Sequence, residues 1–314
     1  MPEIATAIEE ASIKRANDLA PLKALSPEPK GEDDLTPAKA KASLLSKRNV
    51  ALGFSALVLA VLLFMGIFAP LVSPYDPLEV NLDNRLAPIS SSHLLGTDHL
   101  GRDLLSRLIW GTRASLGSVL VIAVLIMVVG FVLGSIAGYS GGLVDSIIMR
   151  CCEAFITFPT FVLALFLIGV LGTGMFNVVL AIVLTHWAWY SRIVRGLVMT
   201  MKNRDYVLAA RVAGAGPVTV FLRHVGPQAF AQLAILATLD LGHMMLHVSS
   251  LSFLGLGIQP PTPEWGSMIS DARQQIWTNP ELAIIPGAMI FLTVLALNVP
   301  GDIFRDKLDP SISE

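Results

Sequence analysis

The sequence predicts an all-α, polytopic membrane protein with six transmembrane helices. Of its 314 residues, 54% are hydrophobic and only 15% are charged, whereas soluble domains carry about a quarter charged residues. The mean hydropathy is +0.66. A helix needs about 20 apolar residues to cross the hydrocarbon core. Stretches that meet this need lie at 49–72, 114–138, 151–172, 176–198, 228–257 and 283–304, within a predicted transmembrane domain from 47 to 308.

The two ends of the chain differ from this domain. Residues 1–46 are rich in Lys, Glu, Asp, Pro and Ala, and they hold too few large apolar side chains to offset the entropy of ordering. We therefore predict a disordered N-terminal tail, and residues 309–314 form a short C-terminal end. Of the 22 Lys and Arg residues, 17 fall in segments that lie on the same side of the membrane as the N-terminus. The positive-inside rule then predicts that both termini lie in the cytoplasm.

Within the spans, local residues predict how the helices pack. In the second stretch Gly130, Gly134 and Gly138 recur every four residues, which leaves a smooth stripe for another helix. Pro159 interrupts the third stretch and is expected to kink it. The turn at 171–174 separates the third stretch from the fourth.

The fifth stretch carries polar residues where lipid-facing residues are expected. Asp240, His243, Met244 and His247 stand at i, i+3, i+4 and i+7, so they share one helical face. An ionised Asp at the bilayer centre costs about 2.5–3.5 kcal/mol on insertion scales, so this face should line a cavity or meet a partner. We predict that it lines a translocation path. His186, in the fourth stretch, is a second candidate for the same path.

These residue types suit a metal ion. Neutral imidazole is a good ligand for Ni²⁺, and carboxylate and thioether groups can supplement it, although transport requires that binding stays weak. Asp240 has the alternative role of orienting one imidazole. A third alternative is a hydrogen-bonded cluster that only packs helices together.

An enzyme is not predicted. The segment "HMMLH" has the histidine spacing of a zinc protease, but Met244 occupies the position of the general base. The chain also lacks a Walker A sequence, so it cannot hydrolyse ATP itself.

Residues 201–228 form a long polar connection on the predicted cytoplasmic side. Tyr206, Ala209, Ala210 and Ala213 recur at helical spacing and give one small apolar face. Gly214 and the pair Gly216–Pro217 then break the helix, and a second short helix is expected to run towards Pro227. A simple connection is usually shorter than these 28 residues, so we predict a segment that fits a groove of a partner.

This segment resembles the EAA coupling loop of permease subunits in ATP-binding-cassette importers. That pattern is Glu-Ala-Ala, three residues, Gly, nine residues, then Ile-x-Leu-Pro. Ala209, Ala210, Gly214 and Pro227 match it, whereas Leu208, His224 and Gly226 replace the Glu, Ile and Leu. The resemblance implies a type I (MetI-like) permease fold and docking to ATPase subunits through this loop.

Further segments resemble one family of these importers, the dipeptide, oligopeptide and nickel permeases. They are "LLGTDHLGRDLLSRLIWGTRASLG" (94–117), interpreted as a folded extracytoplasmic elbow, and the outer loop "PPTPEWGSMISDARQQIWTNP" (260–280). The segments "THWAWYSRIVR" (185–195) and "LDLGHMMLHVSSLSFLGLG" (239–257) are similar to the nickel-transport branch.

The resemblance implies a complete importer around this chain, located in the bacterial inner membrane. Its parts are a second permease subunit, two ATPase subunits that bind ATP, and an extracytoplasmic binding protein. Nickel would be the transported substrate, and this chain itself would bind no cofactor. A peptide permease of the same family remains the alternative. A stand-alone channel would not need the 201–228 segment.

Overall fold

A computed structural model describes the backbone of residues 37–308 and the side chains of residues 48–301. The chain divides into two units, 1–50 and 51–314, and the description below concerns the second. The C-terminal end at 309–314 and most of the predicted tail lie outside the described residues. Residues 37–46, which the sequence assigned to the tail, form the first part of α2. Alanine, lysine and leucine all favour helix, while the lysines make this stretch too polar to count as part of a span.

The described elements are all helical, apart from one isolated bridge between Thr97 and Asp103, which confirms the all-α class. The long helices are α2 (Pro37–Ile67), α4 (Leu104–Ser140), α5 (Gly142–Thr157), α6 (Thr160–Leu171), α7 (Met175–Met201), α10 (Gly226–Phe253) and α12 (Glu281–Leu308). The short ones are α3 (Ala69–Val72), η1 (Leu82–Asn84), α8 (Asp205–Val212), α9 (Pro217–Val220), the π-helix η2 (Phe221–Val225), α11 (Trp265–Asp271) and η3 (Ala272–Gln275).

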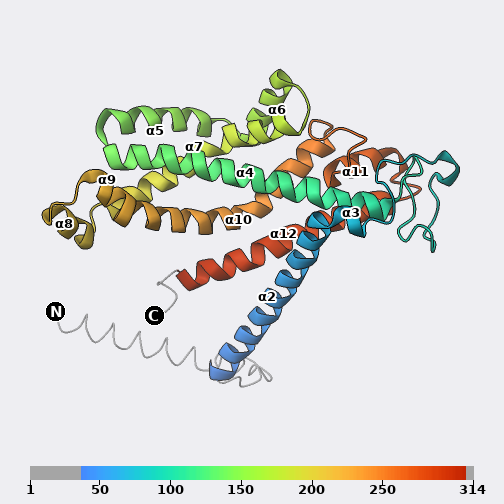
Figure 1. Cartoon of the computed structure of the whole chain (residues 1–314), viewed down its shortest axis with the longest axis horizontal. Helices are drawn as coiled ribbons and strands as arrows, with labels where there is room; N and C mark the ends of the chain where they lie inside the picture. Colours follow the sequence, from blue (N-terminus) through green and yellow to red (C-terminus); the bar gives the residue numbers. More distant parts are fainter. Residues whose placement is uncertain (1–36, 309–314) are drawn as a thin grey trace, which may run out of the picture. The chain divides into compact units, whose positions relative to one another are not determined.

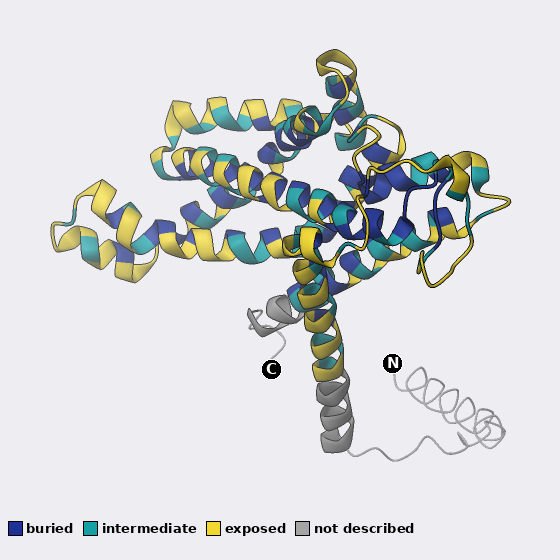
Figure 2. Cartoon of the chain, turned by 45° about the vertical axis from the view of Figure 1, so that its right-hand side comes forward, coloured by how far each residue is buried: buried dark blue, intermediate teal, exposed yellow. Residues whose placement is uncertain are grey.

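Helices α4, α7 and α10 form the centre of a bundle (Figure 1). Helix α7 packs against α4, α5, α6 and α10, while α12 packs against α10 and α11. Figure 2 shows buried residues on the helix faces that meet, and exposed residues on the opposite faces. This core positions the residues of the candidate site.

The bundle has two distinct ends (Figure 1). At the end of α4 that carries its C-terminus, the Tyr139 hydroxyl donates to the carbonyl oxygen of Pro217 over 2.6 Å, next to α8 and α9. At the opposite end, the indole nitrogen of Trp265 in α11 donates to the carbonyl oxygen of Leu108 over 3.2 Å. The 201–228 segment and the 260–280 loop therefore lie at opposite ends of the bundle.

The glycine stripe of α4 is an intrachain contact. A Cβ atom on Gly138 would come within 2.8 Å of the Arg195 carbonyl oxygen in α7, and one on Gly130 within 2.5 Å of the Tyr190 Cβ. The prediction of a close helix approach is confirmed, and the approaching helix is α7 of the same chain.

By length and composition alone, fewer than the six predicted spans qualify among the described helices. Four described helical segments qualify, at Arg48–Ile67, Leu104–Ser140, Pro217–Phe253 and Glu281–Gly301, and α5 with α6 makes a fifth if the bent pair is one span. Helix α7 has 27 residues but is not among them. Its neighbours α4, α5, α6 and α10 cover part of its surface, and within this contact region it carries polar residues such as His186 that lower its hydropathy.

The start of α4 differs from the prediction. Helix α4 begins at Leu104, so the second half of the predicted elbow at 94–117 is helical. The cause is an N-cap: a carboxylate oxygen of Asp103 accepts from the backbone nitrogen of Ser106 over 2.8 Å. The expected kink at Pro159 is confirmed, because α5 and α6 meet there at 91°.

The second helix of the 201–228 segment is not a separate element. Helix α9 passes through the π-helix η2 directly into α10. Pro227 follows the π-helical turn within this continuous run, where the regular α-helical hydrogen-bond pattern is already interrupted. The predicted short helix is therefore the first part of a longer run, and α10 connects mechanically to α9.

Candidate translocation path and coupling segment

Two histidines meet where α7 and α10 run side by side. The rings of His186 and His247 have centroids 5.1 Å apart and are nearly perpendicular. The Nδ1 atom of His186 lies 3.0 Å from the carbonyl oxygen of Ile182, and that of His247 lies 2.8 Å from the carbonyl oxygen of His243. A carbonyl oxygen only accepts, so each Nδ1 carries the hydrogen. Each Nε2 then keeps its lone pair, as a metal ligand requires.

Asp240 and His243 form a second group, nearer to the α8 end. The buried Tyr190 hydroxyl donates to Oδ2 of Asp240 over 3.0 Å. The other carboxylate oxygen lies 3.4 Å from Nδ1 of His243, whose side chain is 69% exposed. Asp240 is therefore held by Tyr190 and placed to orient one imidazole.

The predicted stripe is only partly reproduced. Met244 is fully buried in the hydrophobic core, so its thioether does not lie on the open face beside His243. Within the described residues, no three His, Cys, Asp or Glu side chains are close enough to hold one metal ion together. The predicted residues thus form two small groups in place of a single chelating site, and their role in metal passage stays a prediction.

The predicted coupling residues lie at one end of the bundle. Helix α8 carries Tyr206, Ala209 and Ala210, and Gly214 follows with a φ of +90°, a conformation that side chains rarely adopt. The Tyr206 hydroxyl donates to Oε1 of Gln228 over 2.8 Å and so connects α8 with the start of α10. Apolar side chains around this turn are exposed, namely Leu208, Val212, Val218 and Leu222.

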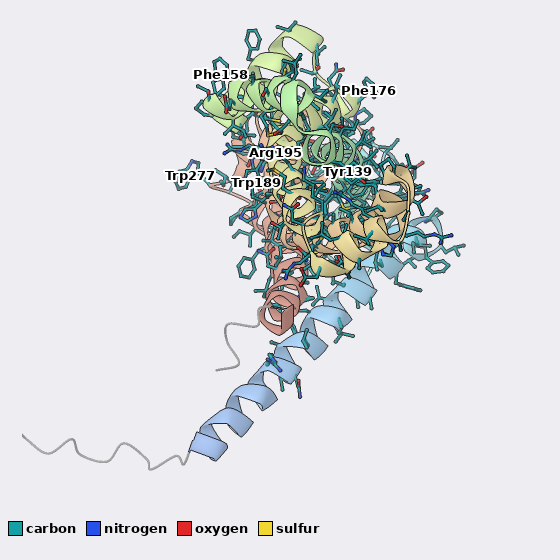
Figure 3. All side chains as sticks on the ribbon, turned by 90° about the vertical axis from the view of Figure 1, so that its left-hand side faces the viewer. Tyr139, Phe158, Phe176, Trp189, Arg195 and Trp277 are labelled. Atoms are coloured by element: carbon teal, nitrogen blue, oxygen red, sulfur yellow. The ribbon has the colours of Figure 1, made fainter. Side chains whose placement is uncertain are left out.

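At the other end, buried charges join the elbow to α11. The guanidinium groups of Arg102 and Arg107 are almost fully buried between the carboxylates of Asp98 and Asp271. Arg102 donates to Asp98 over 2.6 Å. Its second partner is Asp271, 169 positions along the chain, which no local pattern indicates. Beyond this cluster, Trp277 is 93% exposed and points away from the ribbon (Figure 3).

Glu264 is the buried carboxylate that fixes α11. Its oxygens accept from the backbone nitrogens of Gly266 and Ser267 and from the hydroxyl of Ser115 in α4, over 2.9–3.0 Å. Burial raises the pKa of Glu264 above its ordinary value of 4.5, although these hydrogen bonds lower it in part.

We expect Glu264→Ala to lower the free energy of unfolding by about 2–4 kcal/mol, because it leaves several buried donors without an acceptor. A raised folded-state pKa means that the stabilising effect is complete below pH 4.5 and decreases as pH rises through the folded-state pKa. Thermal melting in detergent at pH 4 and pH 8 measures this. The difference in melting temperature between wild type and variant should be larger at pH 4 than at pH 8. A difference that grows with pH would contradict this prediction.

Comparison with known proteins identifies the family. Residues 130–314 match the model of the binding-protein-dependent transport system inner membrane component. The chain belongs to this family. Residues 46–88 of the permease also match the N-terminal transmembrane domain of oligopeptide transport permease C. The protein is therefore the membrane component of a transport system and not an enzyme.

Several curated permeases are similar along most of their length. The nickel transport system permease protein NikC of Escherichia coli (strain K12) is 50% identical over 82% of this permease and 92% of its own chain. The di/tripeptide permease DppC of Pseudomonas aeruginosa is 43% identical over 82% and 86%. The metal-staphylopine permease CntC of Staphylococcus aureus (strain Mu50) is 40% identical over 86% and 93%.

Some residues around the path escaped sequence reasoning. Tyr190 looks like one more aromatic residue of an apolar span, and only its register against α10 places its hydroxyl on Asp240. Gln228 and Gln232 lie at the start of α10, and the available signal was a pair of polar residues four positions apart at the end of an apolar helix.

Proposed function

We propose that this permease is one of two channel-forming subunits of an ATP-binding-cassette importer that moves nickel into the cytoplasm. The 50% identity with NikC carries the proposal. The paired imidazoles of His186 and His247 support it, since two free Nε2 atoms on facing helices give a weak site for a passing divalent ion. Asp240 orients His243 beside them, and Met244 only packs the core.

The remaining parts of the importer follow from the two ends of the bundle. The exposed apolar turn around Gly214 docks on an ATPase subunit, one of two that bind and hydrolyse ATP. The elbow and α11 face the extracytoplasmic binding protein that delivers the ion. A second, homologous permease subunit completes the path on the open side of α7 and α10.

The topology belongs to the same proposal. Helix α7 is the sixth span: 27 residues make about 40 Å of helix, enough to cross the bilayer, and four other helices pack against it. With α8 and α9 in the cytoplasm, the positive-inside rule places both termini there as well.

A peptide importer is the second candidate, because DppC is 43% identical over a similar range. In that case the histidines would only be polar residues beside a wider path.

Deleting the gene for this subunit alone separates the two candidates. We expect accumulation of radioactive nickel to fall to background, while dipeptide uptake stays unchanged, and the gene supplied on a plasmid should restore nickel uptake. Cobalt uptake in the same strain measures selectivity. Loss of dipeptide uptake with normal nickel accumulation would favour the peptide importer.

A further inference from the structure

A cavity of about 670 Å³ lies where α7 ends, α8 begins and α10 begins. Its polar side chains are neutral oxygen and amide groups for the most part, on Thr200, Gln228 and Gln232. All three are exposed. Arg204 and Asp205 contribute one charge of each sign.

The cavity continues the line of contacts that contains the histidines. Because α7 and α10 are antiparallel, lower residue numbers on α10 meet higher numbers on α7. His186 meets His247, then Tyr190 meets Asp240, and Gly196 and Thr200 share the cavity with Gln232 and Gln228. One seam thus runs from the imidazole pair to the α8 end.

From the imidazole pair towards α8, the donor atoms along this seam become weaker ligands for nickel. Nickel prefers imidazole nitrogen, whereas amide and hydroxyl oxygens suit harder ions and hold nickel loosely. Conduction requires sites from which an ion can leave. The cavity also has room for water to return to the ion, because six waters occupy about 180 Å³ at the volume they have in the liquid.

We propose that this cavity is the release site of the path, where Gln232, Gln228 and Thr200 take a divalent metal ion from the imidazoles and pass it to water. The proposal rests on the nickel-import function proposed above and adds to it the site at which the ion leaves. The Gln228 amide oxygen accepts one hydrogen bond from Tyr206 over 2.8 Å and keeps a second lone pair for the ion.

The charges at this site fit release better than storage. Arg204 and Asp205 cancel each other, so the cavity lacks the excess of carboxylates that would retain a divalent ion. The hydrogen bond from Tyr206 also fixes Gln228 beside α8. Movement of α8 by the ATPase would therefore change the release site directly.

The test uses the complete importer in proteoliposomes, with nickel and cobalt uptake as readouts. In the variant carrying both Gln228→Leu and Gln232→Leu, nickel turnover should fall about tenfold, the lower end of what loss of a supporting partner costs at metal sites. Cobalt turnover should fall less, because imidazole holds cobalt less tightly and the ion leaves without help. Thr238→Val, an exposed hydroxyl on α10 that does not line the cavity, is the matched control and should leave both rates unchanged.

Gln232→Glu provides a variant that keeps a polar side chain of the same length. Its carboxylate should retain nickel, so turnover falls while the apparent affinity rises. Equal slowing of nickel and cobalt by the leucine pair, or wild-type rates in both variants, would overturn the release site. A wild-type importer that transports dipeptide but no nickel would instead overturn the proposed function.

Discussion

Replacing His186 and His247 together by alanine is expected to reduce nickel uptake at least about 100-fold, since even indirect partners of a metal site contribute 10- to 100-fold to affinity. Both Nε2 atoms are free to bind, and they come from two helices that face each other. Removing both therefore leaves His243 as the one imidazole among the predicted path residues. Uptake of radioactive nickel by proteoliposomes measures the effect, and ATP hydrolysis in the same samples shows whether the complex is assembled.

The control for this variant is Leu246→Ala, an exposed apolar residue next to His247 on α10. It truncates a side chain at the same level of the helix and should leave uptake within about twofold of wild type, as surface substitutions usually do. Single alanine variants of His186 and His247 should be intermediate. Normal nickel uptake by the double variant would exclude the imidazole pair from the path.

Gly214→Val is expected to uncouple the ATPases from transport. The φ of +90° at Gly214 is unfavourable for any side chain and worst for a β-branched one, at a cost of about 1–3 kcal/mol. At about 1.4 kcal/mol per tenfold, the population of the native turn falls by about 5- to 150-fold. Nickel uptake should fall accordingly, while basal ATP hydrolysis by the partner subunits persists without stimulation by the substrate-loaded binding protein.

Gly216→Val is a closely matched control. Gly216 lies two residues further on and has a φ of −66°, which valine tolerates, and no atom lies within 4 Å of the added Cβ. The same side chain is thus introduced in the same turn without backbone strain. If both variants lost uptake equally, the cause would be the bulk of valine at the docking surface, and the strained turn at Gly214 would not be the determinant.

The long helices were predictable because membrane spans depend on local composition. Apolar runs located α4, α10 and α12, and Pro159 located the bend before α6. The ends of the helices were less predictable. The start of α4 depends on the Asp103 cap, and the passage of α9 into α10 depends on a π-helix that no residue pattern indicates.

The sequence predicted which residue types form the candidate site, but not which of these residues lie together. Helical spacing placed Met244 on the same face as Asp240 and His247, yet the packing of α10 against its neighbours buries Met244 completely. His186 and His247 are 61 positions apart in the sequence, and they meet only because of the register between α7 and α10. Such register depends on how α7 and α10 each pack against α4 and their other neighbours, which is a property of the whole bundle.

The right-angled bend between α5 and α6 has a consequence for how the protein enters the membrane. The two helices have 16 and 12 residues, and neither alone has the length of about 20 that spans the hydrocarbon core. Both pack on α7, which is synthesised after them. Stable integration of this region must therefore wait for α7, so a chain truncated before Met175 should leave residues 142–171 open to added protease during biogenesis.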